Sequence, residues 1–483
     1  MEHTRSKPDS DLASGSQATR KRGVSDLLNE AKDRDDATDI SNEPPKTRRR
    51  VDRDKSPLKE HREQPSGAGS TEKAGQVGKN VVSQAPAFLS YPDPSNSKPK
   101  AIPFQQPSQL ISFSYTPEHV QEFTDSALRY YVDPPLGSNL SYGYDRWVRK
   151  PDQRGRIDAL LKAISNIKHD PKRGVGLPEI GVVSWRGVMT KILTAPYENR
   201  DGWELNVMSL NGTLYLEEHL TEDRLSEKNN MDARQRSQTY YGYAFESYCT
   251  SDAPPGRAPH NNPNPGAPPS WGGDVDTSVQ WCSVVRTKLG DTRMIIGGEV
   301  DCVRGKYTGQ TDTFVELKTS LTIRGQHDES KFERKLLKFY FQSFLLGVPE
   351  IVVGFRTPAG VVTTVQSFKT IQLPRLVRGK PGAWDPVLCL DWGYKFLTFL
   401  KDLVRSTAGD SDSSVWRVKF VPASGVSVEA LDSKGIEDVV NGEDRVGFLP
   451  KWYWEEIRRE EHARLPDEKV TPASKLANAG WQI

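Results

Sequence analysis

Two stretches of sequence decide the fold: Met294-Ile-Ile-Gly-Gly-Glu-Val-Asp-Cys-Val303 and, after a turn that contains glycine, Thr313-Phe-Val-Glu-Leu-Lys-Thr-Ser320. Both are rich in β-branched residues and are bounded by turn residues, a pattern that predicts the two strands of an antiparallel hairpin. Side chains two positions apart on a strand share a face, so Glu299 is expected beside Asp301, and Glu316 beside Lys318. If the register aligns the strands, three carboxylates and one ammonium converge.

Such a cluster of carboxylates is costly unless positive charge joins it. Two carboxylates about 4 Å apart repel by roughly 4 kcal/mol at an effective dielectric constant of about 20. The single ammonium of Lys318 offsets only part of this, whereas a divalent cation neutralises the group. Ligands that are all oxygen favour Mg²⁺, Mn²⁺ or Ca²⁺ over zinc. These ions promote the hydrolysis of phosphoesters, and Lys318 is then placed to orient the nucleophile or to contact the scissile phosphate.

A simpler interpretation is that these charges are exposed and alternate with Val300, Val315 and Leu317 on a half-buried sheet. Alternation alone favours that interpretation, because each short motif is common by itself. The pairing of the two motifs on consecutive strands resembles the D…(D/E)xK arrangement of metal-dependent nucleases, and it favours the metal site.

Three neighbouring motifs have side chains that suit the same site. The segment Tyr241-Gly-Tyr-Ala-Phe-Glu246 places one acid after aromatic residues, where an isolated charge is expensive unless it is paired or bound to metal. In Trp185-Arg186-Gly187, the arginine can clamp a phosphate while the tryptophan packs or stacks on a base. A helix expected over Phe332–Leu346 carries Lys335, Lys338 and Gln342 in one polar stripe, which either faces the carboxylates or is a solvent face.

The remaining pattern predicts an α/β fold of mixed β-sheets flanked by helices, around a D…(D/E)xK nuclease-like core. Two further helices are expected over Val120–Tyr131 and Arg156–Ile167. Strands are expected at Gly181–Trp185, Thr213–Leu216 and Ile351–Phe355.

The chain divides into three parts by composition. Residues 1–100 are dominated by charged and small residues and are expected to be a disordered tail. Its basic clusters, Arg20-Lys-Arg22 and Lys46 with Arg48-Arg-Arg50, favour nuclear import over a solvated charge run. Residues 101–460 are expected to form one large domain with a Pro/Gly-rich loop at 251–273. Residues 461–483 are expected to be a C-terminal tail.

Composition limits the compartments in which the protein is expected and the ligands that it is expected to bind. The net charge is only +2, so binding of nucleic acid has to depend on local patches. The four cysteines are far apart without CxxC spacing, which favours a reducing intracellular compartment and argues against zinc. No apolar run reaches the roughly 18 residues that cross a bilayer, so we expect a soluble protein that does not contact membranes.

In combination, these motifs resemble the signature of the DXO-type decapping nucleases. The resemblance spans about Phe113 to Tyr453. The motifs that carry it, in chain order, are Leu128-Arg-Tyr-Tyr131, Trp185-Arg-Gly187, Leu193-Thr-Ala-Pro-Tyr-Glu198, Gly242-Tyr-Ala-Phe-Glu246, Trp281-Cys-Ser-Val284, Glu299-Val-Asp301, Glu316-Leu-Lys318, Gln342-Ser343 and Phe448-Leu-Pro-Lys-Trp-Tyr453.

The resemblance implies a role for each matching residue. The acids Glu246, Asp301 and Glu316 would ligate a divalent metal, Mg²⁺ first and Mn²⁺ second, together with Glu299 and the carbonyl of Leu317. Glu299, Lys318 and Gln342 would contact substrate or water. The RNA-contacting positions would be Trp185, Arg186, Gly187 and Cys282.

The implied reaction is hydrolysis at the 5′ end of RNA. It removes incomplete guanosine caps or NAD caps as whole units and releases pyrophosphate from triphosphate ends, and some members also degrade RNA from 5′ to 3′. One position departs from the family pattern, because His119 stands where animal members have a substrate-contacting arginine.

The long tail resembles the fungal nuclear branch, which implies a nuclear location and a nuclear 5′-to-3′ exoribonuclease as a partner that the chain stabilises. Two alternatives remain open at this point. The chain could be mainly a non-catalytic stabiliser of that exoribonuclease, or a DNA endonuclease that shares the D…(D/E)xK core.

Overall fold

The structure is a computed structural model that describes residues 86–169, 180–254, 256–257, 266–407 and 413–464. The basic clusters of the N-terminal tail, the middle of the 251–273 loop and residues 465–483 lie outside this part. The first strand, β1 (Ala87–Ser90), pairs with a strand near the C-terminus, so the described fold already begins before residue 101. At the other end, helix α10 (Lys451–Arg464) continues beyond residue 460.

Most strands of the described chain belong to one ten-stranded mixed sheet. Its strands follow the order β1, β16 (Gly425–Ala430), β15 (Trp416–Val421), β6 (Trp203–Leu210), β7 (Thr213–His219), β5 (Val182–Trp185), β10 (Thr292–Glu299), β9 (Gln280–Leu289), β2 (Phe104–Tyr115) and β3 (Gln121–Glu122). Strand β5 runs parallel to both β7 and β10, whereas β9 and β10 are antiparallel. The sheet therefore brings the C-terminal ends of β5 and β10 to the same edge.

A second sheet of six strands lies beside it. Its order is β14 (Val362–Lys369), β13 (Glu350–Arg356), β12 (Phe314–Leu321), β11 (Cys302–Val303), β4 (Tyr130–Tyr131) and β8 (Thr250–Ser251). A short hairpin of β17 (Arg445–Val446) and β18 (Leu449–Pro450) precedes α10.

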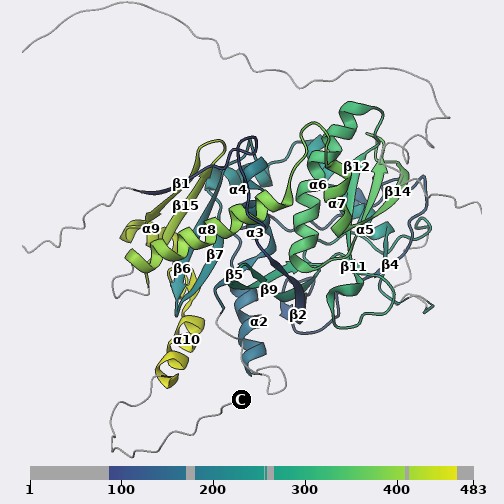
Figure 1. Ribbon diagram of the computed structural model, residues 1–483. Helices are drawn as coiled ribbons and strands as arrows, with labels where there is room; N and C mark the ends of the chain where they lie inside the picture. The colour runs from purple at the N-terminus through teal and green to yellow at the C-terminus, as the bar shows by residue number, and fades with distance from the viewer. Residues whose placement is uncertain (1–85, 170–179, 255, 258–265, 408–412, 465–483) are drawn as a thin grey trace, which may run out of the picture. The chain divides into compact units, whose positions relative to one another are not determined.

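Helices separate and cover the sheets in layers, as Figure 1 shows. One core joins both sheets to the helices α3 (Arg186–Thr194), α6 (Gln326–Leu346) and α8 (Pro386–Thr407). The other face of the large sheet packs on α2 (Asp158–His169) and α10, and the outer face of the small sheet packs on α5 (Ala233–Tyr248). Strand alternation explains this, since Met294 and Ile296 enter the first core while Ile295 enters the second.

The remaining helices of the described chain are short: α4 (Glu222–Asn229), α7 (Leu373–Val377) and α9 (Ser433–Val440). In the part of the chain that the structure describes, no helix is both long and apolar enough to cross a bilayer. The predicted α/β architecture of mixed sheets flanked by helices is confirmed, as are helices α2 and α6 and strands β5, β7 and β13.

The expected single hairpin over Met294–Ser320 is largely wrong. The first stretch forms two strands in different sheets, because β10 ends at Glu299 and only the two residues of β11 pair with β12. The side chain of Asp301 accounts for the break, since its Oδ2 accepts a hydrogen bond from the Leu317 amide at 2.6 Å. The chain therefore crosses from one sheet to the other at Val300-Asp301.

The helix expected over Val120–Tyr131 is also wrong. This segment contains β3, a turn and β4, because its polar residues bond to neighbouring strands instead of to a helix. The Ser114 hydroxyl donates to the Thr124 carbonyl at 2.8 Å, and the Trp281 indole donates to Asp125 at 2.9 Å.

Candidate active site

Four acids meet where the two sheets join. Glu299 ends β10, and Asp301 lies in the connection to β11. Glu316 is on β12 of the small sheet, and Glu246 is in the last turns of α5, which packs on β12. Each of the four is electrostatically coupled to others in the group, so the convergence predicted from the sequence is present although the expected hairpin is not.

Two glycines let a fourth element approach the same place. A Cβ at Gly297 would lie 2.8 Å from the Trp185 ring, and one at Gly298 would lie 2.9 Å from the Arg186 Cβ. These distances are shorter than real Cβ contacts, so side chains there would push β10 away from the start of α3. Helix α3 follows β5 directly, which places Arg186 at its first turn beside the acids.

Arg186 and Lys318 both bind Glu316. The Arg186 Nη1 donates to Glu316 Oε2 at 2.9 Å, and the Lys318 ammonium donates to Oε1. Although burial acts to raise it, these two cations hold the pKa of Glu316 at about 2. Burial likewise opposes the charge of Lys318, but Glu316 and Asp301 raise the pKa of the ammonium. Glu316 is thus an ionised carboxylate, 1% exposed, between two cations.

The other three acids lack such compensation. Burial, followed by the charge of Asp301, raises the pKa of Glu299 to about 7. Burial and then Glu316 raise the pKa of Asp301 to about 6, and burial with Asp301 and Glu299 raises that of Glu246 well above its ordinary value. Without more positive charge, these carboxyls cannot all ionise near neutral pH.

The donor set fits a hard divalent cation. Four carboxylates and no imidazole or thiolate converge here, and the uncompensated negative charge supplies the driving force for binding. Within the described residues, however, no three acidic, His or Cys side chains already surround one point. Glu316 faces its two cations, Asp301 accepts from the Leu317 amide, and Glu299 accepts from the Gln280 amide at 3.0 Å. Binding an ion therefore requires these carboxylates to turn.

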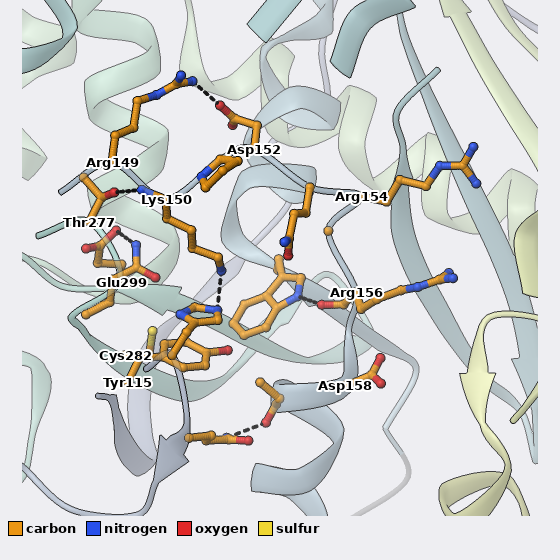
Figure 2. A pocket seen from close by; sticks show the side chains of 18 of the residues that line it. Tyr115, Arg149, Lys150, Asp152, Arg154, Arg156, Asp158, Thr277, Cys282 and Glu299 are labelled. Atoms are coloured by element: carbon orange, nitrogen blue, oxygen red, sulfur yellow. Dashed lines mark hydrogen bonds and ion pairs between the residues drawn. The ribbon is translucent and has the colours of Figure 1, made fainter. Parts of the chain in front are cut away.

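Two cavities open on the acids. The larger, about 930 Å³, is lined by Glu299, Trp185, Tyr243, Gln280 and Cys282, and by much of the segment 149–156, as Figure 2 shows in part. The smaller, about 160 Å³, is lined by Glu246, Glu299 and Asp301. Glu299 and Tyr243 border both, so the two cavities adjoin, whereas Glu316 and its two cations line neither.

Only some of the remaining predicted residues line the cavities. Cys282 pairs with Glu299 across β9 and β10, and burial raises the pKa of its thiol, so it is a wall of the cavity and not a nucleophile. Gly187 is the second residue of α3, where a Cβ would meet nothing within 4 Å. Gln342 is half-buried on α6 and lines neither cavity.

The expected stripe of lysines on α6 does not face the acids. Lys338 forms an ion pair with Glu198 at 3.1 Å in a separate groove, and Lys335 lies near Arg356 and Lys331. The apolar face of α6 packs into the core instead, which turns these lysines outward.

The basic segment 149–156 was not predicted to belong to the site, although its run of arginines and lysine was an available signal. Arg149 pairs with Asp152 at 2.9 Å, and Arg154 pairs with Glu222 at 2.6 Å. The Lys150 ammonium instead contacts the imidazole Nε2 of His119, whose ring stacks on Tyr115. Lys150 thus brings a cation into the cavity with no acidic partner among the described residues.

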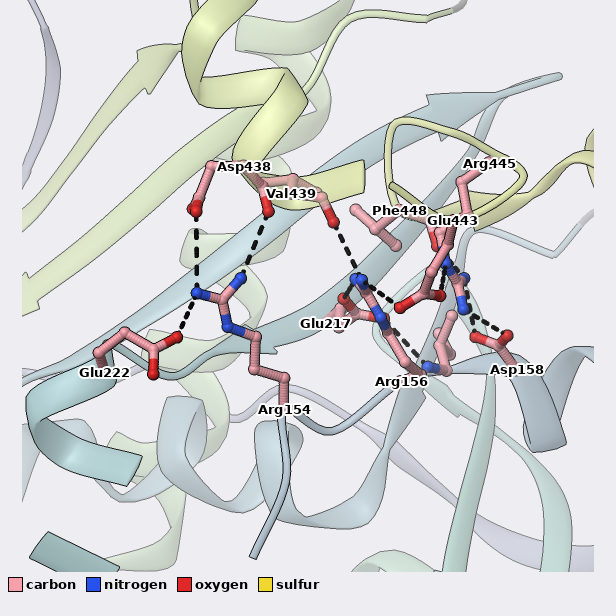
Figure 3. Close-up of polar contacts among 11 residues, drawn as sticks. Arg154, Arg156, Asp158, Glu217, Glu222, Asp438, Val439, Glu443, Arg445 and Phe448 are labelled. Atoms are coloured by element: carbon pink, nitrogen blue, oxygen red, sulfur yellow. Dashed lines mark hydrogen bonds and ion pairs between the residues drawn. The ribbon is translucent and has the colours of Figure 1, made fainter. Parts of the chain in front are cut away.

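A buried ion pair holds the end of this segment. Arg156 Nη1 donates to Glu217 Oε1 at 3.2 Å, and the Ile157 amide donates to Oε2 at 3.0 Å (Figure 3). Burial raises the pKa of Glu217 to about 7, although Arg156 and the Ile157 amide act in the opposite direction.

The shift of Glu217 predicts a pH dependence of stability. The pKa of this carboxyl is higher in the folded than in the unfolded chain, so its protonated form stabilises the fold. This contribution is complete when the pH is below the ordinary pKa of 4.5, and it is lost as the pH rises through about 7. We therefore expect the free energy of unfolding to fall between about pH 5 and pH 8 more steeply in the wild type than in Glu217→Gln. Denaturant unfolding at both pH values measures the two slopes, and equal slopes would contradict the assignment.

Comparison with known proteins gives the family. A family model described as RAI1-like PD-(D/E)XK nuclease matches residues 105–454. The decapping nuclease RAI1 of Mycosarcoma maydis is 36% identical over 451 residues, which cover 74% of this chain and 88% of that protein.

Two crystal structures share the fold. Rai1 of S. pombe in complex with 3′-FADP aligns with a TM-score of 0.57 and 26% identity, over 72% of this chain and all (100%) of that one. Rai1 of Candida albicans in complex with pU5-Mn²⁺ aligns with a TM-score of 0.64 and 24% identity, over 78% and 100% of the two chains.

The mixed sheets and the D…(D/E)xK acids define an enzyme of the PD-(D/E)XK nuclease class. More narrowly, the chain belongs to the RAI1-like family of decapping nucleases. The resemblance expected from the sequence motifs is thereby confirmed.

Proposed function

We propose that this chain hydrolyses the 5′ ends of RNA, removing incomplete guanosine caps, NAD caps and the pyrophosphate of triphosphate ends. The observation that carries the proposal is the cluster of four acids, with Glu316 buried and the other three half-buried, next to a cavity whose rim is basic, in a member of a decapping nuclease family. The basic rim suits a phosphate backbone, and the acids suit the divalent ion that phosphoryl chemistry uses.

Within this proposal, Glu246, Glu299, Asp301 and Glu316 hold the ion with the carbonyl of Leu317, and the ion is Mg²⁺ or, second, Mn²⁺. When bound, it lowers the pKa of a water nucleophile and offsets charge on the phosphoryl oxygens. Lys318 keeps Glu316 ionised and presents an ammonium to the scissile phosphate or the water. Gln342 would have to reach the same water by a change of rotamer, because it lines neither cavity.

Some of the substrate-binding residues in this proposal lie on the walls of the larger cavity. Trp185 and Cys282 line it, and they offer flat or apolar surface to a nucleotide. Arg186 and Gly187 occupy the first turn of α3, where an arginine fork and backbone amides suit phosphate oxygens.

A panel of RNA 5′ ends tests the proposed reaction. Capped, NAD-ended, triphosphate and monophosphate RNA of one sequence are incubated with the protein in Mg²⁺, in Mn²⁺ and in a chelator. We expect metal-dependent release of an intact cap dinucleotide, of NAD or of pyrophosphate. The acids alone supply no positive charge to offset the negative charge on the phosphoryl oxygens. Absence of all three products, or cleavage of duplex DNA in preference to RNA, would reject the proposal.

Lys150 is expected to add to the affinity for RNA. The His119 Nδ1 lies 3.3 Å from the Ser278 carbonyl, so this nitrogen carries the proton and Nε2 accepts from Lys150. The ammonium can then also donate to a phosphate, although burial lowers its pKa. Lys150→Ala should weaken binding of single-stranded RNA severalfold and reduce the slope of log K against log salt by about 0.7. Titrations between about 50 and 200 mM salt measure this, with Lys434→Ala on the exposed face of α9 as the matched control. An unchanged slope would mean that Lys150 does not contact an RNA phosphate.

We also propose that the protein acts in the nucleus and stabilises a nuclear 5′-to-3′ exoribonuclease. The basic clusters of the first hundred residues and the fungal relative support this proposal. Co-purification with such an exoribonuclease, followed by thermal unfolding of the partner with and without a catalytically inactive form of this chain, tests it. A partner that gains no stability would reject it.

A further inference from the structure

Glu217 has no part in the proposed reaction, yet it is a carboxylate 2% exposed in the middle of a β-strand. Its side chain enters the layer between the large sheet and helices α2 and α10, where its neighbours on β7 and β5, Tyr215 and Val183, belong to an apolar core. A buried ion pair contributes little to stability compared with apolar residues of similar size. We therefore look for a reason other than stability for the position of the Glu217 carboxylate and its bond to Arg156.

The contacts of Glu217 lead to the wall of the larger cavity. Its two oxygens bond the Arg156 side chain and the Ile157 amide, which fixes two consecutive residues at the entry to α2. The carbonyl of Arg156 in turn accepts a hydrogen bond from the Trp185 indole at 3.0 Å. Trp185 is the residue before α3 and lines the cavity. One backbone unit thus separates the buried carboxylate from the indole.

The same arginine is held from the other side by the C-terminal part of the chain. Arg156 Nη2 donates to the Val439 carbonyl at 3.0 Å and to Glu443 at 3.1 Å. Next to it, Arg445 forms two bonds with Asp158 at 2.7 and 3.0 Å (Figure 3). These bonds hold the segment 156–158 from two directions. The Arg156 carbonyl is thereby kept in place for the Trp185 indole, which forms part of the cavity wall.

From this geometry we infer that Glu217 is a positioning residue for RNA binding: it fixes the carbonyl of Arg156, which in turn fixes the indole of Trp185 against a nucleotide in the cavity. The inference rests on the proposed function only in taking single-stranded RNA as the ligand. Glu217 does not line the cavity whereas Trp185 does, so we expect its effect on affinity to pass mainly through Trp185.

A double-mutant cycle tests this dependence. Glu217→Gln keeps the shape but replaces one of the two oxygens that bond Arg156 and the Ile157 amide, and Trp185→Phe keeps a ring but removes the indole donor. Binding of a 5′-phosphorylated oligoribonucleotide is measured by fluorescence anisotropy in a chelator, so that no turnover contributes. We expect each single variant to bind about fivefold more weakly or worse, and the double variant to bind no more weakly than the weaker single.

Glu222→Gln is the matched control, because Glu222 pairs with the neighbouring Arg154 but is exposed on α4. It should leave affinity unchanged alone and in combination with Trp185→Phe. Wild-type affinity in Glu217→Gln, or losses that multiply in the double variant, would overturn the inference. If Glu217→Gln does not fold, Glu217→Asp gives the same expectation, because its shorter side chain withdraws from the Ile157 amide. Failure of the wild type to bind RNA would instead reject the proposed function.

Discussion

The double variant Glu299→Ala/Asp301→Ala is expected to lose at least about 1,000-fold of the hydrolytic rate, equivalent to about 4 kcal/mol of transition-state stabilisation. The same variant is expected to unfold at a higher temperature than the wild type when no metal is present. Activity and stability are expected to move in opposite directions because the cost of burying the two carboxylates outweighs the single hydrogen bond that Asp301 accepts from the Leu317 amide. Burial and the repulsion of neighbouring carboxylates raise both pKa values, although Arg186 and Lys318 act in the opposite direction.

The sign of the stability change follows from those shifts. The pKa of Glu299 is raised from 4.5 to about 7 and that of Asp301 from 3.8 to about 6, so each group favours folding only while it is protonated. This favourable contribution is lost as the pH rises through about 6 to 7, and above that range the ionised pair destabilises the metal-free protein. The gain in unfolding temperature on mutation should therefore be larger at about pH 8 than at about pH 5.

Thermal unfolding in a chelator and again in Mg²⁺ gives the measurement. Added metal should stabilise the wild type but not the double variant, because ligand binding stabilises only a protein that retains its site. The control is Glu222→Ala/Asp223→Ala, two exposed acids at the start of α4. A double variant that unfolds below the wild type in the chelator would mean that the two acids are structural.

The acids could be proposed from the sequence because two charged motifs, each common by itself, follow one another on two expected strands. The pairing of Glu299 and Asp301 with Glu316 and Lys318 predicted their convergence, although the two strands belong to different sheets. The topology could not be read in the same way. Whether Val300-Asp301 continues a strand or crosses to a second sheet depends on Asp301 bonding the Leu317 amide, a side-chain contact that periodicity does not record.

Long-range contacts explain the other omissions. Arg186 could be proposed as a phosphate clamp from its motif, but its bond to Glu316 depends on β5 lying parallel to β10 and on Gly298 leaving space. The sequence left open whether the polar stripe of α6 faces the acids or the solvent, because helical spacing defines a face without saying what that face meets. Lys338 meets Glu198, a residue 140 positions earlier in the chain.

Glu316→Gln is expected to have the opposite effect on stability from the Glu299 and Asp301 substitutions, although it too should abolish activity. Its two oxygens bond Arg186 and Lys318, and the pKa of about 2 means that the carboxylate is stabilised where it lies. Removing its charge leaves two largely buried cations uncompensated, which should cost about 3 to 5 kcal/mol of the free energy of unfolding.

A second substitution separates charge balance from packing. Lys318→Met in the Glu316→Gln background removes one of the stranded cations and should recover part of the lost stability without restoring hydrolysis, since the reaction needs the carboxylate and the ammonium themselves. Denaturant unfolding in a chelator and the assay of RNA 5′ ends measure the two properties. A Glu316→Gln protein as stable as the wild type would imply that Glu299 and Asp301 already balance the two cations. The four acids would then be one interchangeable cluster, and their division into a carboxylate fixed by the protein and carboxylates reserved for the ion would not hold.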